Sequence, residues 1–469
     1  MPIEVRPEAS FDYTVDVLII GAGACGLTAA LASADEGASV LVLERDASPA
    51  GTSAMSTGLI PAAATPEQAE AGIPDTVEHF AADMIEKAGG QSDTRVVERL
   101  AAESAETVMW LRSSHNVPLS LVDGFLYPGH RYRRMYGTPN RTGSELIAAL
   151  ASACGDAGVD ILTDAYAETL ITDRDQAVRG VRFQRPDGGY EEMGCQTLIL
   201  ATCGFAGNAE MVAQWMPEMS GAVFHGHPGA DGSAVHWGAA LDAQLGDMTG
   251  YQGHGGLAYG HGVPILWPTI MRGGFQVNRE GARFSDETLG YSEQAAKILQ
   301  QPEGAAWTIF DQTIEDVMLQ FDDYQDALQA GAIKTANSIG GIAEIVGLST
   351  DGLMRTFAVV ETHANGNEVD VFGRRFHRDA LLKPPFKIVR VSGAIFHTQG
   401  GLEVDEDARV IRQDGRPFPN LYAGGGAARG ISGPNASGYM AGNGLLTATG
   451  LGKIAGRHAA KQAQWTAAP

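Results

Sequence analysis

Three glycines with the spacing G-x-G-x-x-G give the sequence its clearest chemical signal. Gly21 allows a tight turn, Gly23 lets the backbone approach a pyrophosphate, and Gly26 lets a helix pack closely against a strand. Glu44, further along the chain, carries a carboxylate that can accept hydrogen bonds from ribose hydroxyls. The spacing predicts a dinucleotide site, and the alternative is a glycine-rich turn without a ligand.

The elements around these glycines have the order that such a site requires. Residues 16–20 form a short apolar run typical of a buried strand, and residues 27–37 are alanine-rich and helical in character. Residues 39–43 resemble a second buried strand that ends at Glu44. In this strand–helix–strand order the helix N-terminus turns its positive dipole end toward the phosphates.

Two further stretches of small residues could lie against a ligand. Residues 50–61 are small and hydroxylated, so their backbone amides are accessible and a planar ligand can lie close to them; the alternative is a mobile surface loop. Asp231 and Gly232 precede a small-residue helix within residues 229–241, whose N-terminus also suits a ligand.

Length and charge narrow the class of protein. A chain of 469 residues is long enough for two or three domains, and a net charge of −23 argues against nucleic acid and anionic membrane surfaces as partners. The four cysteines lack C-x-x-C spacing, which suits a reducing compartment and predicts no metal site. We find neither a signal-peptide profile nor an apolar run of membrane-spanning length, so we expect a cytoplasmic protein.

The periodicity of apolar residues outlines the remaining elements. Helices are expected at residues 76–88, 92–114, 143–157, 293–300, 313–329, 338–346, 350–365 and 443–461. Strands near residues 160–163, 169–172 and 178–184 are interpreted as a small antiparallel insertion, and residues 196–204 as a further buried strand ending in a glycine turn. Composition changes near Gly250, which we interpret as a domain boundary.

Residues 127–137 concentrate three arginines, a histidine and three tyrosines in an acidic protein. This segment is either a wall of a substrate or cofactor pocket or a solvated basic loop, and the sequence leaves both readings open. The arginines are Arg131, Arg133 and Arg134.

Five motifs in order make the chain resemble the flavoprotein family of fumarate reductases and 3-ketosteroid dehydrogenases, closer to the ketosteroid dehydrogenase branch. The motifs are GAGACG at 21–26 with Glu44, ATCGFAGN at 201–208, GARFSDE at 281–287, HTQGG at 397–401, and LYAG at 421–424 with Gly442 and Asn443.

The resemblance implies an α/β fold: a Rossmann-like FAD-binding domain of the glutathione-reductase type with an inserted α+β capping domain. The FAD-binding domain would comprise residues 1–247 and 388–469, and the capping and catalytic domain residues 248–387. The helix that begins at Asn443 would face the pyrimidine end of the flavin, where its amides stabilise negative charge. Some relatives attach FAD through a histidine after the second strand, but residues 52–58 contain none, so we expect noncovalent FAD.

The resemblance and the motifs together assign the expected FAD-binding residues. They are Gly21, Gly23, Ala24, Cys25, Gly26, Glu44, Arg45, Gly51, Thr52, Ser53, Ser56, Gly58, Ala167, Ala201, Thr202, Gly204, Asn208, Asp231, Gly401, Gly424, Gly425, Asn443, Leu445 and Leu446.

The resemblance also implies the reaction: a hydride moves between a substrate carbon and flavin N5 while a side chain transfers a proton at the adjacent carbon. Tyr291 falls where fumarate reductases have the proton-carrying arginine and ketosteroid dehydrogenases a tyrosine, and Tyr439 falls where a second, carboxylate-binding arginine is expected. Tyrosine can serve as acid or base. The alternative for Tyr291 is a structural tyrosine that caps a helix.

The oxygen of a ketone substrate needs an electrophilic partner. Candidates are the amides of residues 425–432, the Ser432 hydroxyl and Tyr439, although the run GGGAAR at 424–429 departs from the Tyr-Pro-Gly-Pro-Gly pattern of ketosteroid dehydrogenases. His397 matches a substrate-binding histidine of fumarate reductases, its alternative being a structural role. Arg429, with the arginines of 131–134, leaves open a ketone that also carries a carboxylate. His254 and His261 are candidates for the cap side of the pocket.

We therefore expect an FAD-dependent oxidoreductase that acts on CH–CH bonds by α,β-dehydrogenation of a cyclic ketone such as a 3-ketosteroid or an oxocyclohexane-type compound. The alternatives are a fumarate-reductase-like reduction of an unsaturated dicarboxylate and a flavin-binding protein without turnover. The expected partners are a small-molecule ketone and an external electron acceptor, with no nucleic acid and no membrane span. The oligomeric state is open, a homo-oligomer included.

Overall fold

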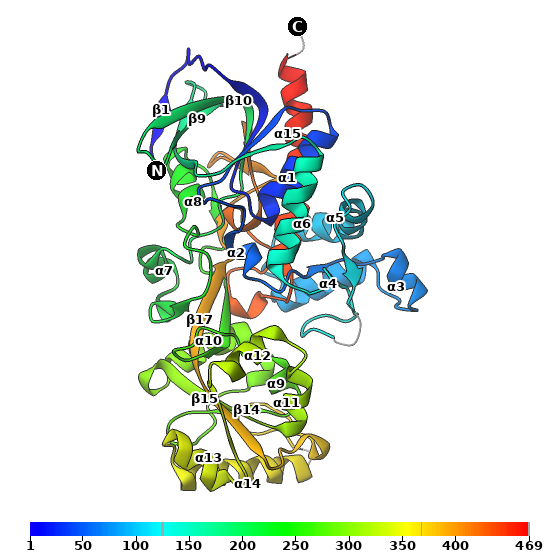
Figure 1. The fold of residues 1–469 in the computed structure, drawn as a ribbon, viewed down its shortest axis with the longest axis vertical. Helices are drawn as coiled ribbons and strands as arrows, with labels where there is room; N and C mark the ends of the chain where they lie inside the picture. The colour runs from blue at the N-terminus through cyan, green and yellow to red at the C-terminus, as the bar shows by residue number, and fades with distance from the viewer. Residues whose placement is uncertain (123–125, 367, 468–469) are drawn as a thin grey trace. The chain divides into compact units, whose positions relative to one another are not determined.

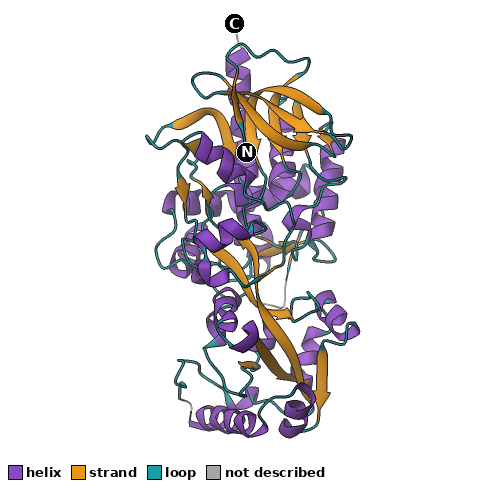
Figure 2. Cartoon of the chain, turned by 90° about the vertical axis from the view of Figure 1, so that its left-hand side faces the viewer, coloured by secondary structure: helices purple, strands orange, loops and turns teal. Residues whose placement is uncertain are grey.

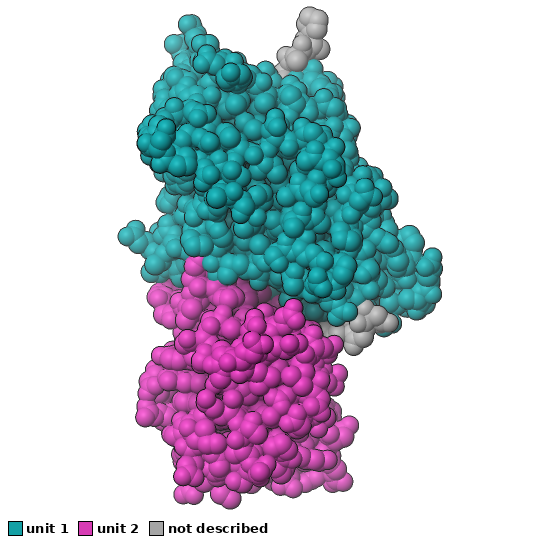
Figure 3. Space-filling model, in the orientation of Figure 1, with its two compact units in different colours: residues 1–215, 226–251, 397–469 teal, residues 216–225, 252–396 magenta. Residues whose placement is uncertain are grey.

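A computed structural model describes residues 1–122, 126–366 and 368–467. The chain divides into two compact units (Figure 3). Unit 1 comprises residues 1–215, 226–251 and 397–469, and unit 2 comprises residues 216–225 and 252–396. Both combine helices with strands (Figure 2), so the expected mixed α/β class is confirmed. The functional assignment of the ranges 1–247, 248–387 and 388–469 stays a prediction.

A parallel sheet forms the centre of unit 1. Its strands lie in the order β7 (Asp160–Leu162), β3 (Val40–Leu43), β2 (Thr14–Ile20), β10 (Tyr190–Leu200) and β20 (Pro417–Ala423). The apolar residues of β2 and β10 that pair across the sheet, such as Leu18 with Leu198, are fully buried, which explains why these strands are continuous apolar runs.

An antiparallel extension continues this sheet. β8 (Tyr166–Thr172) pairs with β9 (Val178–Gln184), and β9 pairs with the first half of β10. The expected antiparallel insertion exists, but its first expected strand was placed wrongly: β7 pairs in parallel with β3. The chain reaches β7 through α6 (Gly143–Asp156), and a helical crossover returns a strand parallel to its neighbour.

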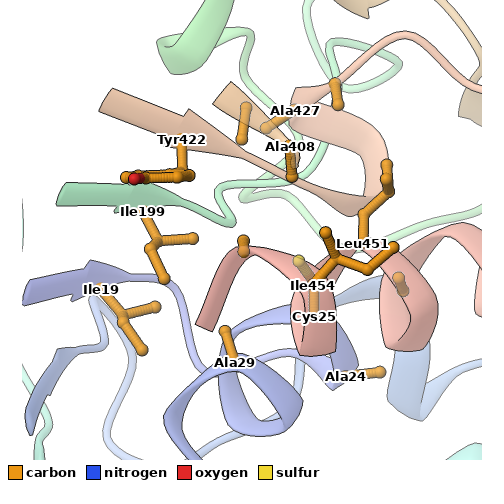
Figure 4. Close-up of a cluster of buried hydrophobic side chains, with 14 of the residues drawn as sticks. Ile19, Ala24, Cys25, Ala29, Ile199, Ala408, Tyr422, Ala427, Leu451 and Ile454 are labelled. Carbon is orange, nitrogen blue, oxygen red and sulfur yellow. The ribbon is translucent and has the colours of Figure 1, made fainter. Parts of the chain in front are cut away.

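Helices α1 (Ala24–Asp35) and α15 (Asn443–Ala467) pack against each other beside this sheet (Figure 1). Small residues allow the close approach: a Cβ on Gly452 would lie 2.6 Å from the carbonyl oxygen of Cys25, and one on Gly456 would lie 2.2 Å from that of Ala29. Figure 4 shows Cys25 of α1 beside Leu451 and Ile454 of α15. This contact holds α15 against the helix that directly follows the predicted phosphate loop.

The other elements of unit 1 surround this core. The remaining helices are α2 (Gly51–Ala54), α3 (Pro66–Glu70), α4 (Val77–Lys87), α5 (Thr94–Ser113), α7 (Ala209–Trp215) and α8 (Ser233–Ala240). The shorter strands are β1 (Ile3–Val5), β4 (Ile60–Pro61), β5 (Ser120–Leu121), β6 (Met135–Gly137), β12 (Leu245–Gly246), β18 (Gly401–Leu402) and β19 (Arg409–Ile411).

Unit 2 is a sheet with helices on both faces. Its strands are β11 (Val223–Phe224), β13 (Tyr251–Ala258), β14 (Phe275–Val277), β15 (Ala305–Asp311), β16 (Ile333–Ala336) and β17 (Phe386–Thr398), the first residue of β13 and the last two of β17 belonging to unit 1. Alternate residues of β15 enter two different apolar cores, Trp307 and Ile309 one, Ala306 and Phe310 the other. Helices α13 (Ile339–Val346) and α14 (Thr350–Gly366) cover the first core; α11 (Gln312–Met318) and α12 (Asp322–Gln329) cover the second.

The single helix expected at 313–329 is wrong, because the chain forms α11 and α12 there. The break lets Met318 and Tyr324 enter the same core, and the Tyr324 hydroxyl donates to Glu315 Oε1 at 2.9 Å. Two further helices, α9 (Pro268–Met271) and α10 (Tyr291–Leu299), complete unit 2. Within the described part of the chain no helix has both the length and the apolar character needed to cross a bilayer.

Candidate functional site

The glycine loop of unit 1 has the backbone geometry that its sequence predicts. Gly21 has φ +105°, a conformation that favours glycine, and a Cβ there would lie 2.5 Å from the carbonyl oxygen of Ala201. A Cβ on Gly26 would lie 1.8 Å from the carbonyl oxygen of Gly21. These two glycines are therefore required by contacts within the protein.

Gly23 differs, because protein atoms leave space in front of it. A Cβ on Gly23 would meet only Ser53 Oγ, at 3.7 Å, and one on Gly51 would meet only the Gly23 Cα, at 3.8 Å. The backbone at both positions borders one open space beside the N-terminus of α1, where an anion is stabilised. A Cβ would fill this cradle, which fits the pyrophosphate of a dinucleotide.

Glu44 is buried and fixed by two backbone donors. Its Oε2 accepts from the Ala22 amide at 2.7 Å, and its Oε1 accepts from the Asp46 amide at 3.0 Å. Each carboxylate oxygen has a second lone pair, so the expected bond to a ribose stays a prediction. The first bond ties the end of β3 to the glycine loop.

The small-residue loop after β3 contacts the start of α6, although residues 55–57 within it are exposed. Residues 51–54 form α2, the Ser56 carbonyl accepts from the Gly143 amide at 2.7 Å, and a Cβ on Gly58 would lie 2.6 Å from the Thr142 carbonyl oxygen. The start of α6 therefore holds the loop against the glycine cradle.

The loop after β10 contributes an unpaired polar atom. Thr202 Oγ1 is buried without a hydrogen-bond partner among the described residues, and Cys203 has φ +63°, which is uncommon for a residue with a side chain. Cys203 Sγ lies 3.6 Å from Thr52 Oγ1, so this loop adjoins the segment around α2. An orphaned hydroxyl at this position fits a bound ligand that accepts or donates a hydrogen bond there.

The N-terminus of α8, in contrast, already has an anion. Asp231 Oδ1 accepts from the Ser233 amide at 2.9 Å, and Asp231 Oδ2 lies 3.4 Å from a guanidinium nitrogen of Arg45. Asn208 Nδ2 donates to the Asp231 carbonyl at 3.1 Å. A ligand at this position would contact the ion pair of Asp231 and Arg45 rather than a free helix N-terminus, because the Asp231 carboxylate already accepts from the Ser233 amide.

The start of α15 supplies a second orphaned atom. Asn443 is fully buried, its Nδ2 donates to Ser432 Oγ at 3.0 Å, and its Oδ1 has no partner among the described residues. Gly424 and Gly425 lie against Cys25, since Cβ atoms on them would lie 2.7 Å from Cys25 Sγ and 3.2 Å from Cys25 Cβ. With the glycine cradle and Thr202, these features fit a bound FAD that spans from the glycine loop to α15.

All residues expected to bind FAD belong to unit 1. Some of them have side chains buried in the apolar core, so only their backbone atoms are available for the predicted contact with FAD: Ala24, Cys25, Ala167, Leu445 and Leu446.

The catalytic candidates of unit 1 gather near the same end of α15. A Cβ on Gly444 would lie 3.0 Å from His397 Nε2 and 3.8 Å from the Tyr439 hydroxyl oxygen. His397 and Tyr439 are in edge-to-face contact with centroids 5.4 Å apart, and burial lowers the pKa of His397 to about 4. His397 Nδ1 lies 3.1 Å from Gln399 Nε2. His397 is therefore uncharged at neutral pH, with Nε2 toward the helix N-terminus.

Two other candidates of unit 1 are already engaged. The Ser432 hydroxyl donates to Gln399 Oε1 at 2.7 Å. Arg429 donates to Asp247 Oδ2 at 2.7 Å and to Glu403 Oε1 at 2.9 Å. The Ser432 hydroxyl proton is thus used within unit 1, and the charge of Arg429 is already paired with two carboxylates there.

Tyr291 lies in unit 2 as the first residue of α10, half-buried in a group of five rings. We call His225, His254, Trp267, Tyr291 and Phe396 the ring cluster. His254 stacks on Phe396 with centroids 5.1 Å apart and an interplanar angle of 8°, and lies 5.3 Å from Tyr291. Burial lowers the pKa of His254 to about 3. His261, the other histidine expected here, is exposed in a turn after β13 and is not part of the cluster.

Part of the basic segment at 127–137 is buried, and both expectations for the segment as a whole stay predictions. Arg134 is fully buried, with Nη2 and Nη1 each 2.8 Å from a carboxylate oxygen, of Asp75 and Asp83 respectively. His130 Nε2 lies 2.8 Å from the Ala441 carbonyl oxygen, and burial lowers its pKa to about 4. His130 and Arg134 are therefore buried supports of unit 1, whereas Arg131 in the same segment stays exposed.

Sequence reasoning missed Gln399 and Trp267. Gln399 contacts both His397 and Ser432, and Trp267 contacts Tyr291, with ring centroids 6.1 Å apart. Gln399 lies inside the HTQGG motif, which could have indicated it; nothing in the sequence near Trp267 distinguishes it from a core tryptophan.

Comparison with known proteins agrees with this geometry. Residues 16–445 match the model of a family described as "FAD binding domain". The chain is 29% identical to "Probable fumarate reductase Ifc3" of Shewanella frigidimarina over 96% of this chain and 75% of that protein. It resembles the open conformation of a flavocytochrome c3 fumarate reductase with a TM-score of 0.82, 27% identity and coverage of 97% and 79%.

A third comparison concerns the fold. A 3-ketosteroid-Δ4-(5α)-dehydrogenase from Rhodococcus jostii RHA1 has a TM-score of 0.78 at 22% identity, with 98% of this chain and 99% of that chain covered. Because the family match spans most of the sequence and the residues of unit 1 fit the cofactor, the chain belongs to the FAD binding domain family, as an enzyme of the FAD-dependent oxidoreductases.

Proposed function

We propose that this enzyme introduces or removes a carbon–carbon double bond next to an uncharged carbonyl group, as in a cyclic ketone of the 3-ketosteroid or oxocyclohexane type. The observation that carries the proposal is the setting of Tyr291. This phenol begins α10 and lies among aromatic rings, 5.3 Å from the centroid of His254, which is uncharged at neutral pH. Aromatic rings and an uncharged histidine favour a neutral substrate, because a carboxylate that contacts only such groups loses its hydration and gains no opposite charge.

In the proposed reaction Tyr291 transfers a proton at the carbon beside the carbonyl group. A positioned phenol can act as general acid or base, and a carbon acid beside a ketone needs no stronger base. Bound FAD supplies the two-electron redox chemistry. In unit 1, Tyr439 and His397 are the candidates that bind substrate oxygen, since both adjoin the N-terminus of α15, which favours developing negative charge.

Reduction of an unsaturated dicarboxylate is the second candidate, favoured by the 29% identity to a protein named as a fumarate reductase. That reaction needs cations that bind two carboxylates. Arg429 and Arg134 are each held by two carboxylates, and His397 is uncharged at neutral pH. We therefore favour the uncharged carbonyl compound, and dehydrogenation as the direction, with an external electron acceptor and noncovalently bound FAD.

A matched pair of variants tests the role of Tyr291. Tyr291→Phe removes the phenol and keeps the ring, so we expect FAD binding to persist while substrate-driven reduction of the flavin slows by about 100-fold or more, the usual scale for loss of a general acid or base. Tyr259→Phe is the control, because Tyr259 is an exposed tyrosine of the same unit. Stopped-flow absorbance under anaerobic conditions measures both rates. Equal rates for Tyr291→Phe and the unmodified enzyme would remove Tyr291 from the mechanism.

A further inference from the structure

The ring cluster of unit 2 brings together side chains from five separate segments of the chain. His225 follows β11, His254 lies in β13, Trp267 precedes α9, Tyr291 begins α10, and Phe396 lies in β17. His225 and Phe396 have ring centroids 4.8 Å apart, and Trp267 stands edge-on to His254 at 5.9 Å. None of the five belongs to either of the two apolar cores of unit 2 described above.

The cluster is a poor candidate for an additional core, because three of its members are only half-buried. His225, Tyr291 and Phe396 retain partial exposure, whereas His254 and Trp267 are 5% and 4% exposed. Aromatic rings with one free face or edge can still accept another ring in stacked or edge-to-face geometry. The cluster therefore offers aromatic surface that unit 2 does not itself cover.

Trp267 adds a specific polar feature. Its indole Nε1–H is buried and has no hydrogen-bond partner among the described residues. A buried donor without an acceptor is unfavourable, and tryptophan N–H groups usually find a partner when they are buried. The indole ring stands edge-on to both His254 and Tyr291, so the unpaired donor belongs to the cluster.

The protonation of His254 and the ion pairs of unit 2 favour an uncharged ligand. The Gly256 amide donates to His254 Nδ1 at 3.1 Å, which places the proton of the neutral ring on Nε2. Two arginines of the same unit with buried side chains form ion pairs with carboxylates: Arg374 pairs with Glu287 at 2.8 Å, and Arg283 pairs with Glu287 and Asp370. Neither the five rings of the cluster nor these two ion-paired arginines provide the free cation that a carboxylate ligand needs.

We propose that the ring cluster is a subsite for a flat, conjugated ring carried by an uncharged substrate, and that the Trp267 Nε1–H donates a hydrogen bond to an oxygen of that substrate. The substrate class is a neutral ketone that carries such a ring and whose dehydrogenated form is an enone conjugated with it. This proposal rests on the proposed function for its identification of the ligand as the substrate, and it specifies which substrates the enzyme prefers.

Three small molecules separate the parts of this proposal. Benzylideneacetone carries a phenyl ring and a ketone, ethylideneacetone replaces the ring by a methyl group, and cinnamate replaces the ketone by a carboxylate. Calorimetric titration of the enzyme with oxidised FAD measures binding without turnover, because each probe already contains the double bond. We expect benzylideneacetone to bind at least tenfold more tightly than either of the other two.

Three variants test which side chains contribute to the binding of benzylideneacetone. Trp267→Phe keeps an aromatic ring and removes the donor, so we expect benzylideneacetone to bind about five- to tenfold more weakly, the range for one hydrogen bond. Phe396→Leu keeps apolar volume and removes the stacking ring, so it should reduce the preference for the phenyl compound over ethylideneacetone. Trp465→Phe, at a tryptophan that is 75% exposed on α15, should change neither value.

Equal affinities for benzylideneacetone and ethylideneacetone in the unmodified enzyme, or unchanged binding in both Trp267→Phe and Phe396→Leu, would overturn the subsite. The proposed function fails in a different way. If benzylideneacetone binds as expected but neither enone reoxidises chemically reduced FAD, the subsite is supported and the proposed reaction is refuted. If both enones reoxidise the flavin and both bind with the same affinity, the proposed reaction is supported and the subsite is refuted.

Discussion

Replacing Gly23 by alanine should weaken FAD binding without disturbing the protein. Gly23 has φ −80° and ψ −174°, which alanine adopts without strain, and the added Cβ would meet only Ser53 Oγ at 3.7 Å. Gly26 is the contrast in the same motif: its Cβ would lie 1.8 Å from the Gly21 carbonyl oxygen, so alanine there must displace the backbone. The two substitutions therefore separate loss of cofactor from loss of stability.

The size of both effects follows from these distances. A methyl group in the cradle at Gly23 would keep a phosphate oxygen from the backbone amides, and hydrogen bonds to charged groups contribute about 1.5–3 kcal/mol. We therefore expect the Kd for FAD to rise about 10- to 150-fold in Gly23→Ala. Gly26→Ala should instead destabilise the apoprotein by about 1–3 kcal/mol, the usual cost of overpacking.

The assay is titration of apoprotein with FAD, followed by flavin fluorescence, together with the melting temperature of each apoprotein. Gly155→Ala in α6 is the control, because a Cβ at that glycine would meet nothing within 4 Å. Gly23→Ala should melt with the unmodified apoprotein, and Gly26→Ala should melt earlier. An unchanged Kd in Gly23→Ala would refute the placement of the pyrophosphate in the cradle.

Two further predictions concern stability. Arg134→Met should destabilise unit 1 by about 3–5 kcal/mol, because it removes the buried cation that pairs with Asp75 and Asp83 and leaves Asp83 with the half-exposed Arg131. Arg416→Met, at an exposed pair, should leave the melting temperature nearly unchanged, and thermal melting measures both variants. Stability should also fall as the pH drops from 6.5 to about 4. The unfolded chain binds protons in this range at three histidines that burial keeps neutral in the folded protein, each contributing up to about 1.4 kcal/mol per pH unit. Urea unfolding at a series of pH values measures this slope, which should be shallower in variants with glutamine at one of these histidines: His130, His254 or His397. A slope that is unchanged in all three variants, or Arg134→Met melting with the unmodified protein, would contradict these assignments.

The sequence predicted the parts of the fold that depend on local order. The strand, glycine loop, helix and second strand from β2 to β3 follow one another directly, so periodicity and glycine spacing were sufficient. β7 was assigned to the wrong set of strands, because strand direction depends on the crossover through α6 rather than on the three residues of the strand. The break between α11 and α12 was missed because both halves have helical periodicity, and only burial in a common core separates them.

Charged residues were the least predictable part of the candidate site. Arg134 lies in a basic stretch of sequence, but its partners Asp75 and Asp83 are far away along the chain. Arg429 looked available for a substrate carboxylate for the same reason, until the fold placed Asp247 and Glu403 beside it. Pairing over such distances depends on the tertiary fold, which neither composition nor local spacing specifies.

The most direct test of the proposed function is the visible absorbance of bound FAD under anaerobic conditions, with one candidate substrate at a time. The panel is a 3-ketosteroid, cyclohexanone, a carboxylated cyclohexanone and succinate. We expect an uncharged cyclic ketone to bleach the flavin and succinate to leave it unchanged. Bleaching by succinate alone would contradict the proposed function and would favour the dicarboxylate reaction.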